Sequence, residues 1–552
     1  MKRRVLLLLL LVLIIITGSI DTNATELVLK INNPKMVIDN DEMDIEYWEN
    51  TAPVIVNGRS MLPIRPVIEV LGGVVRWDDE DRKVTIEYND RKIEMWLNVK
   101  LMKVDGEDRY FDVPPMSISG RTMVPLRFVS ESLGFEISWD GKNKKISIKT
   151  NQNDFAKYQG EISFWHYNAE EAVGIVKAFN NRYPNVKVNL SVNPLKDMVY
   201  QNKLTSAIKA GSGVPDVFPS EASFVKKFVD DEEIYTDLSD ISNDILVNMV
   251  PYTVDIGTDY TGRLKVLTNQ LSVGAFLYKK SVAEKYLGTS DSNKIADMLS
   301  SEDNMLETAK KLKVKSKGKV ALFSSWEDLK KMYLGGRSEG WVIDGKLTID
   351  QNVLNFIDFS KKIKENKYEA GYSEGTSSVN AAIAGDENFL ATVCPSSDIY
   401  WVINKNDKKA FEGGRWGIAK PPIPFGCGGT WYGISNNSEV KDLSWRFLKF
   451  LTIDTYAMKE WAVKYENLPN NLYLLSQGIP NNRTVDVNMH EFFGPLIKDV
   501  NYRIYTKYDD NINNNFNQYI NAYLDGKISS KEEFFKQFKS DVQILYPEIV
   551  VE

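Results

Sequence analysis

Hydrophobic and polar residues alternate at both ends of residues 160–190, and a helical pattern separates these two stretches. Ile162 and Phe164 alternate with polar neighbours, which is the two-residue period of a strand. A three-to-four-residue apolar spacing follows, at Ala172, Ile175, Val176 and Phe179. A second alternation comes at Val186, Val188 and Leu190. The pattern predicts a strand–helix–strand unit that closes onto a mostly parallel sheet.

The start of this helix carries a capping signal. Asn168 precedes the helical pattern, and Glu171 follows three residues later, as in a capping box. Trp165 and His166 then fall at the carboxyl end of the first strand, where open α/β sheets bind their ligands.

The following residues extend the pattern. A helix over 201–210 ends at Gly211, and residues 215–218 predict a second parallel strand. Residues 262–268 and 272–278 predict strands that leave this unit, 280–395 is rich in helical patterns, and 430–435 predicts a returning strand. Helices are expected at 444–451 and 456–463. The last helix is predicted to bury the stripe Phe535, Phe538, Val542 and Leu545.

The first 150 residues contain an internal repeat. Residues 56–86 align without gaps on residues 118–148, at a shift of 62. The shared positions include the pairs Gly58/Gly120, Arg59/Arg121, Pro63/Pro125, Arg65/Arg127, Glu69/Glu131, Gly72/Gly134, Trp77/Trp139 and Asp78/Asp140. Each copy, about 56–88 and 118–150, predicts a hairpin, a short helix and a second hairpin.

The motif G-R-[ST]-M-[LV]-P-[IL]-R in both copies resembles the copper amine oxidase N-terminal domain, often called a stalk domain, over residues 27–150. The chain has only two histidines, His166 and His490, and neither lies in this module. A copper amine oxidase site needs several imidazole ligands, so that activity is excluded. Arg65–Glu69 and Arg127–Glu131 fit either a structural i,i+4 pair or a contact to a wall polymer.

The N-terminus predicts secretion. Met1–Arg4 is basic and Val5–Ile16 is apolar, as in a signal peptide over residues 1–24, although a short membrane anchor stays open. We therefore expect a secreted, extracellular and cell-surface-associated protein. In an oxidising compartment Cys394 and Cys427 could pair or stay as two thiols. The polar residues 151–158 predict a linker.

Length and charge limit the number of domains and the kinds of partner that are expected. A chain of 552 residues is too long for one ordinary core, so several domains are expected. Its formal net charge of −7 argues against nucleic acid as a partner.

Residues 159–549 resemble the family 1 extracellular solute-binding proteins of ABC importers, the maltose-binding-protein type. AFNNRYPNVKV (178–188), AIKAGSGVPDVF (207–218), GAFLYKKSVAEKYL (274–287) and GGTWYGISNNSEVKDLSWRFLKFLT (428–452) follow one another in family order. The resemblance implies an α/β fold of two lobes, the type II periplasmic-binding-protein-like fold, behind a small duplicated β-rich α+β stalk.

The motifs of common enzymes are missing from the sequence, which contains no G-x-S-x-G, Walker A, HExxH or CxxC pair. A pair of carboxylates in a glycan-cleaving enzyme stays open. Sugar binding needs aromatic faces together with carboxylates and amides, and the chain has 12 Trp and 26 Tyr. The expected ligand-binding residues are Trp165, His166, Glu221, Asn269, Gln270, Tyr278, Asp398, Trp401, Trp431 and Tyr432. For Trp165 and Trp431, burial in the core is an equal alternative.

These patterns, read with the resemblance, predict a binding protein without catalytic residues, metal or cofactor. We expect it to capture a carbohydrate or oligosaccharide between its lobes and to deliver it to the permease subunits of an ABC importer, with the stalk free to contact the cell wall. The alternatives are a cell-surface glycan-binding or sensory module without transport, and a glycan-cleaving enzyme.

Overall fold

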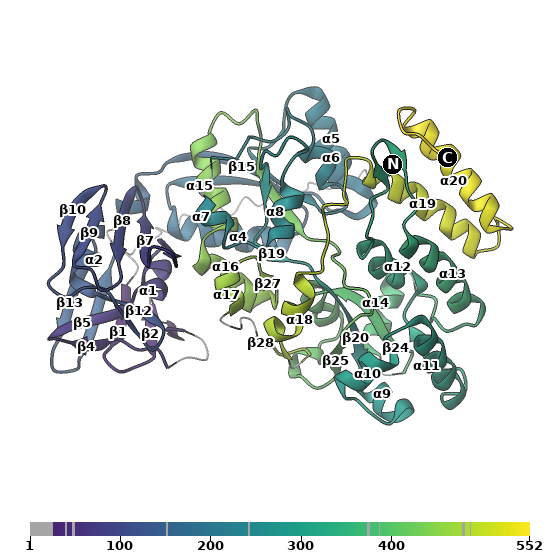
Figure 1. The fold of residues 1–552 in the computed structure, drawn as a ribbon, viewed down its shortest axis with the longest axis horizontal. Coiled ribbons are helices and arrows are strands. Elements are labelled where there is room, and N and C mark those ends of the chain that lie inside the picture. Colours follow the sequence, from purple (N-terminus) through teal and green to yellow (C-terminus); the bar gives the residue numbers. More distant parts are fainter. Residues whose placement is uncertain are drawn as a thin grey trace, which may run out of the picture.

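The computed structural model describes residues 26–38, 41–46, 50–150, 153–240, 243–372, 376–385, 387–476, 478, 481–485 and 487–552. The expected signal peptide, residues 1–24, lies outside these residues. The described chain forms a stalk (residues 26–150), a first lobe (160–267 and 430–465) and a second lobe (274–419 and 509–545) (Figure 1). No helix among the described residues is long and apolar enough to cross a membrane.

Lobe one is built on a five-stranded sheet in the order β16-β15-β17-β26-β18. Its strands are β15 (Gly160–His166), β16 (Val186–Val192), β17 (Val217–Glu221), β18 (Val266–Leu267) and β26 (Thr430–Ile434). β15 runs parallel to β16 and β17, whereas β26 runs antiparallel to β17 and β18. The predicted strand–helix–strand unit is therefore confirmed.

Helix α4 (Ala169–Arg182) connects β15 to β16 and buries Ala172, Ile175 and Phe179. The Asn168 side chain accepts a hydrogen bond from the Glu171 backbone N–H, as the capping signal predicts. The other helices of lobe one are α5 (Val199–Ala210), α6 (Val225–Val229), α7 (Asn243–Leu246), α8 (Pro251–Gly257), α15 (Lys441–Thr452) and α16 (Thr455–Tyr465).

Lobe two has a four-stranded sheet in the order β21-β24-β20-β25. Its strands are β20 (Gly274–Lys279), β21 (Ala321–Phe323), β24 (Phe389–Pro395) and β25 (Trp416–Ala419), and only β21 and β24 are parallel. Its helices are α9 (Lys280–Leu287), α10 (Ser292–Met298), α11 (Glu302–Lys315), α12 (Trp326–Gly335), α13 (Gln351–Glu365) and α14 (Ser377–Ala384). The pattern over 280–395 thus predicted a helix-rich lobe correctly, but not its strands.

The chain ends with two helices, α19 (Asp509–Leu524) and α20 (Lys531–Leu545), which pack on lobe two. Phe534, Phe538 and Val542 are the buried face of α20. The predicted stripe was therefore wrong at two positions, because Phe535 is only half-buried and Leu545 is exposed. Phe516 of α19 meets both Phe534 and Phe538, so the partner helix selects this face.

Three segments connect the lobes. Residues 268–273 lead from β18 to β20, residues 420–429 lead from β25 back to β26, and residues 466–508 lead from α16 to α19. The first and third segments pair through β19 (Gln270–Leu271) and β27 (Leu468–Pro469). The third also contains α17 (Leu472–Ser476), β28 (Asn481–Asn482), β29 (Val487–Asn488) and α18 (Met489–Ile497).

The stalk shows the predicted repeat as β4 (Val54–Val56), β5 (Arg59–Pro63), α1 (Ile64–Val70), β6 (Val74–Asp78) and β7 (Lys83–Tyr88), then β11 (Met116–Ile118), β12 (Arg121–Pro125), α2 (Leu126–Leu133), β13 (Glu136–Asp140) and β14 (Lys145–Lys149). Gly58, in the turn between β4 and β5, has φ of 72° and Gly72 has φ of 93°. Both lie in the left-handed region that favours glycine.

The closing hairpin of each repeat pairs with three strands that lie outside the repeats. The sheet β13-β14-β1-β2-β3 joins the closing hairpin of the second repeat to β1 (Glu26–Lys30), β2 (Lys35–Ile38) and β3 (Asp41–Asp44) from the start of the chain. The sheet β10-β9-β8-β7-β6 joins the closing hairpin of the first repeat to β8 (Arg91–Trp96), β9 (Leu101–Val104) and β10 (Glu107–Tyr110). A third sheet, β11-β12-β5-β4, pairs the repeats directly. One hydrophobic cluster accordingly spans the stalk.

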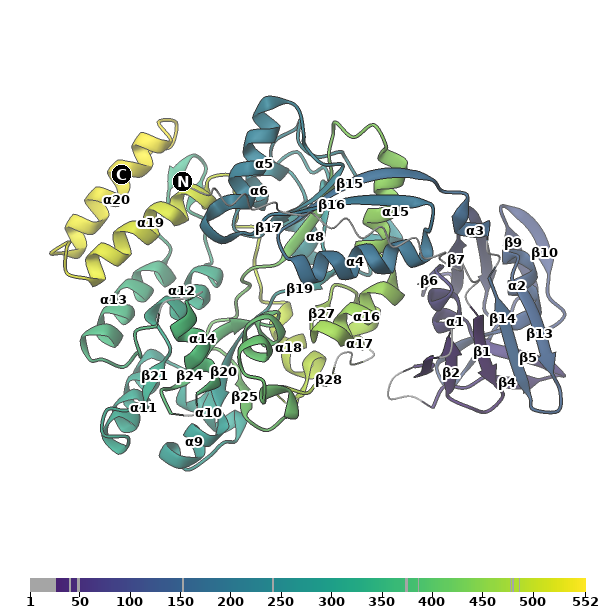
Figure 2. The same ribbon diagram turned by 180° about the vertical axis from the view of Figure 1, so that it is seen from behind.

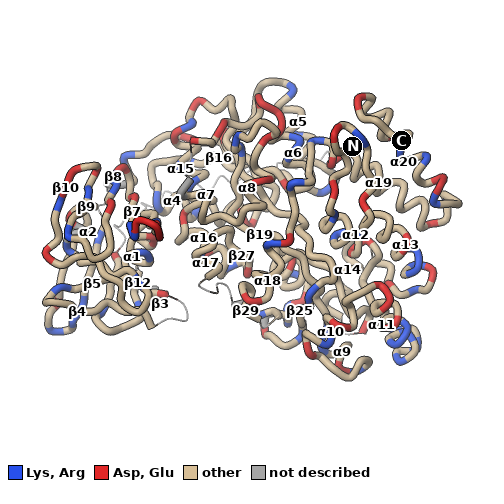
Figure 3. Tube along the Cα trace, in the orientation of Figure 1, with Lys and Arg blue, Asp and Glu red and all other residues tan. Residues whose placement is uncertain are grey.

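The stalk lies against lobe one through its first repeat, on the side of α16 and α17 (Figures 1 and 2). Phe155, in the short helix α3 (Asn153–Ala156), makes edge contacts with Tyr88 of the stalk and Tyr183 of lobe one. Acidic and basic residues are interspersed along the stalk and along lobe one (Figure 3). No disulfide joins Cys394 to Cys427, so the disulfide alternative is not realised.

Candidate functional site

The carboxyl ends of the parallel strands in lobe one bring together several predicted site residues. Trp165 and His166 end β15, and Glu221 ends β17. Trp165 is half-buried, and the Lys203 ammonium lies 4.4 Å from the centre of its ring. Glu221 is also half-buried and accepts a hydrogen bond of 3.0 Å from the backbone N–H of Ser223. Burial raises the pKa of the Glu221 carboxyl.

His166, in contrast, belongs to a closed internal network. It is fully buried, its Nδ1 accepts from the backbone N–H of Asn168 at 2.9 Å, and its Nε2 lies 3.0 Å from the hydroxyl of Tyr432. Since Nδ1 accepts, this network assigns the proton to Nε2, which donates to Tyr432. Burial lowers the pKa of His166 to about 3, so the ring stays neutral at physiological pH.

Three of the other expected aromatic residues are also enclosed. Tyr432 is fully buried in lobe one, while Trp431 donates from Nε1 to the carbonyl of Thr253 at 3.1 Å. Tyr278 is buried in lobe two and donates to the carbonyl of Ser290 at 2.7 Å. In this conformation these rings support the sheets from inside and present almost no surface.

Two of the predicted ligand-binding residues, Asn269 and Gln270, are amides in the first segment between the lobes. Gln270 accepts from the Asn467 side chain at 2.8 Å. Asn269 is buried, and within the described part of the chain its Oδ1 has no hydrogen-bond partner. An unsatisfied buried oxygen is costly unless another molecule supplies a donor.

Lobe two presents a corresponding edge at the carboxyl ends of β21 and β24. Asp328 lies just beyond β21, and its Oδ2 accepts from the hydroxyl of Thr392 at 2.8 Å. Asp398 follows β24, and Lys331 lies 3.9 Å from its carboxylate. Sequence reasoning selected Asp398 but missed Asp328, Lys331 and Thr392. The strand over 321–323, which was not predicted, is the signal that would have identified Asp328.

The two lobes touch on both sides of these edges. Trp401 of lobe two stacks on Tyr465 of lobe one, with 5.0 Å between ring centres. Close by, Glu170 accepts from Lys405 at 2.5 Å and from the Tyr400 hydroxyl at 2.9 Å, and the hydrogen bond from Lys405 lowers the pKa of Glu170.

On the other side, Gln201 of lobe one donates to Asp510 of α19 at 2.7 Å. Lys227 lies 3.8 Å from the same carboxylate. The residues that follow β15 in lobe one and β24 in lobe two therefore contact each other across the lobes.

No group of three or more His, Cys, Asp or Glu side chains among the described residues could hold a metal ion. The site offers aromatic faces, carboxylates, amides and ammonium groups, which suit a polar organic solute.

Comparisons with known proteins agree with this architecture. Residues 161–458 match the model of the family described as bacterial extracellular solute-binding protein, and residues 44–148 match that of the copper amine oxidase N-terminal domain. Both resemblances stated from the sequence are thus confirmed.

Solved structures show the same two-lobed fold. The binding protein of an ABC transporter from B. animalis subsp. lactis, in complex with beta-1,6-galactobiose, has 16% identity and a TM-score of 0.59, over 72% of this chain and 100% of that one. The galacto-N-biose-/lacto-N-biose I-binding protein of Bifidobacterium longum, in complex with lacto-N-biose, has 16% identity and a TM-score of 0.58, over 71% and 99%. A receptor of Streptomyces glaucescens studied with acarbose has 18% identity and a TM-score of 0.57, over 71% and 100%.

At these identities the likeness establishes the fold alone. The family match is broader evidence, because it covers more than half of the chain. The chain belongs to the bacterial extracellular solute-binding proteins.

Proposed function

We propose that this protein binds a carbohydrate between its lobes, outside the cell, and passes it unaltered to the permease subunits of an ABC importer. The observation that carries the proposal is that the strand ends of both lobes hold polar and aromatic groups near the contacts between the lobes. Lobe one has the half-buried Trp165 and Glu221, and lobe two has Asp328, Lys331 and Asp398. A tryptophan face suits the C–H side of a sugar ring, while carboxylates and amides suit its hydroxyls.

The structural neighbours support a sugar as the ligand. Proteins of this fold are described in complex with beta-1,6-galactobiose, lacto-N-biose and acarbose. The first two are binding proteins of ABC transporters, which supports transport as the role of the present chain. The first ligands to test are therefore disaccharides and longer oligosaccharides.

Two of the expected contacts need movement of the protein. Among the described residues, the buried Asn269 oxygen has no hydrogen-bond partner, and Trp401 stacks on Tyr465. In the proposed open state the lobes separate and expose both groups, and ligand binding then favours closure by its higher affinity for the closed state.

A calorimetric titration against a panel of oligosaccharides tests the proposal. We expect at least one sugar to bind, and Trp165→Ala to weaken its binding about tenfold, which is about 1.4 kcal/mol. Trp139→Ala is the matched control, because that tryptophan is 47% exposed on the second repeat of the stalk. A panel without any binding sugar, or equal affinity of Trp165→Ala and wild type, contradicts the proposal.

Binding without cleavage is tested by mass spectrometry of the bound sugar. After prolonged incubation we expect an oligosaccharide of unchanged length, and shortened products would instead favour a glycan-cleaving enzyme. Transport is tested in the producing bacterium, where deletion of this chain should abolish uptake of the labelled sugar.

A further inference from the structure

The third segment between the lobes is held firmly to lobe one just where it leaves the hinge. We call residues 468–473 the hinge segment. Its strand β27 pairs with β19 of the first connecting segment, with Leu468 opposite Leu271. Asn470 then accepts from the backbone N–H of Val250 at 2.9 Å and donates to the carbonyl of Thr268 at 2.9 Å. The hinge segment therefore cannot shift without moving the first connecting segment.

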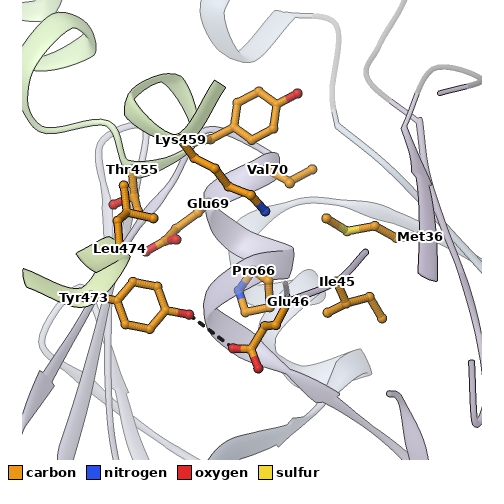
Figure 4. A pocket seen from close by; sticks show the side chains of 11 residues that line it. Met36, Ile45, Glu46, Pro66, Glu69, Val70, Thr455, Lys459, Tyr473 and Leu474 are labelled. Carbon is orange, nitrogen blue, oxygen red and sulfur yellow. Dashed lines mark hydrogen bonds between the residues drawn. The ribbon is translucent and has the colours of Figure 1, made fainter. Parts of the chain in front are cut away.

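The stalk contacts the same segment. Tyr473 donates its hydroxyl to Glu46 of the stalk at 3.1 Å (Figure 4). The guanidinium of Arg65 lies 4.3 Å from the centre of the Tyr473 ring. Glu46 is buried and also accepts from Arg121 at 2.6 Å. Two charged stalk residues thus hold one hinge-segment tyrosine from two directions.

A small cavity of about 30 Å³ that opens to solvent lies at this contact (Figure 4). Its walls come from both partners, with Met36, Glu46, Glu69 and Val70 from the stalk and Thr455, Lys459, Tyr473 and Leu474 from the other side. Glu69 is buried, with Arg65 at 3.4 Å. Burial raises the pKa of Glu69 to about 7 and lowers that of Lys459, as expected for charges enclosed between two domains.

A second recess continues this contact to the hinge itself. Arg65 and Val75 of the stalk face Asn248, Asn470 and Asn471 across it. Further along, the Nε of Arg182 in lobe one would lie only 3.1 Å from a Cβ atom placed on Gly72 of the stalk. The first repeat therefore fits closely against lobe one from the end of α4 to the hinge segment.

We propose that the first repeat of the stalk is a docking surface for the hinge segment of the same chain, and that it couples the position of the stalk to the opening and closing of the lobes. The surface consists of Arg65, Glu69 and Val70 of the first repeat, together with Glu46, which precedes that repeat in the chain. Any change in the hinge segment on closure alters its contacts with this surface, and coupling between two such equilibria is reciprocal. The stalk can then signal whether the lobes hold a ligand.

Distance measurements between spin labels test the coupling without any sugar, although the inference rests on the proposed movement of the lobes. One label pair joins the stalk to lobe one, at Lys103 and Lys187, and a second pair joins the lobes, at Lys187 and Lys315. We expect Arg65→Met and the milder Tyr473→Phe to broaden or shift both distance distributions. The matched control is Arg127→Met, the equivalent residue of the second repeat, whose side chain is 76% exposed.

Two results would overturn the inference. If the stalk distance changes and the lobe distance does not, the stalk docks without coupling. If neither changes in both variants while thermal melting shows that they are folded, the contact does not hold the stalk. Failure of the sugar panel bears only on the proposed ligand, because these distances are measured in the free protein.

Where a sugar does bind, its affinity gives a second readout. Reciprocal coupling predicts a change in Kd of about fivefold in Arg65→Met, the lower end of typical coupling between sites. Arg127→Met should bind as wild type does.

Discussion

The two repeats of the stalk carry the same charged residues in opposite surroundings. On α1, Arg65 and Glu69 are 20% and 7% exposed and lie 3.4 Å apart under lobe one. On α2, Arg127 and Glu131 are 76% and 68% exposed and lie 4.0 Å apart. The same motif is thus part of a domain interface in one copy and a solvated surface in the other.

A second pair of contacts shows the same contrast with the roles of the two repeats reversed. Arg121 pairs with Glu46, whose side chain is 4% exposed next to the hinge segment. Arg59 occupies the equivalent position of the first repeat and pairs with Asp112, whose side chain is 41% exposed. The interface with the hinge segment therefore uses α1 of the first repeat and, through Glu46, Arg121 of the second. Neither ion pair by itself indicates a function, because the burial of a pair determines how much it contributes to the stability of the fold.

The sequence differs where the environments differ. The first repeat has Ile68 and Val70 where the second has Ser130 and Ser132. Val70 is buried at the cavity, whereas Ser132 is half-exposed. An apolar residue at this position suits a covered face, and serine suits an open one.

The largest expected effect is a difference in stability between variants of the Arg121–Glu46 pair and variants of the Arg59–Asp112 pair. Arg121→Met leaves the buried Glu46 carboxylate without its guanidinium and should destabilise the protein by about 3 kcal/mol, since breaking a buried ion pair is costly. Arg59→Met, in the exposed pair, should cause no measurable change. Scanning calorimetry of both variants measures this difference, and equal effects would mean that the two faces are equivalent.

The next effect concerns pH. Burial raises the pKa of Glu69 from 4.5 to about 7, against the opposing charges of Arg65 and Lys459 and with a further rise from Asp454. Between pH 4.5 and 7 the folded chain therefore binds more protons than the unfolded chain, so this carboxyl makes stability fall as pH rises through that window. The loss reaches about 3 kcal/mol above pH 7.

Glu69→Gln should remove this part of the pH dependence, and Glu131→Gln should leave it as in wild type. Melting temperatures at pH 5, 6, 7 and 8 provide the measurement. A wild-type slope that persists in Glu69→Gln would assign it to other buried acids, of which Glu171 is one.

The smallest effect exchanges the residues that distinguish the two faces. Val70→Ser removes buried methyl groups and adds a hydroxyl to the docking surface, so it should cost about 2 kcal/mol. Ser132→Val should stay within about 0.5 kcal/mol of wild type, as for most surface changes. Chemical denaturation of both variants tests this exchange, and a stabilising Val70→Ser would argue against a tightly docked first repeat.

Much of the fold followed from local patterns. The spacing of Ala172, Ile175 and Phe179 predicted the buried face of α4, and the 62-residue shift predicted both stalk repeats. Glycines such as Gly58 and Gly72 also mark the ends of strands and helices in the sequence, because their positive φ values disfavour most other residues. These features depend on residues close in the chain, so one sequence contains the information.

The candidate site was less predictable. All seven residues of β24 and all five of β26 are buried, so their strands have no polar face, and periodicity could not tell whether Trp431 or Tyr432 points to solvent. Tyr278 was likewise enclosed by the antiparallel neighbours of β20. Asp328 and Lys331 came to the interface through the pairing of β21 with β24, which are far apart in sequence.

By itself, then, the sequence determined the duplicated stalk and the strand–helix–strand unit that opens lobe one, because periodicity, turns and internal repetition can be read along the chain. The family of the lobes followed from the resemblance of its ordered motifs. Only the tertiary structure decided which aromatic residues are covered, which strands pair with the closing hairpins of the stalk repeats and which repeat meets the hinge segment. Those outcomes depend on contacts between residues hundreds of positions apart, such as Glu46 with Tyr473, and no local pattern encodes them.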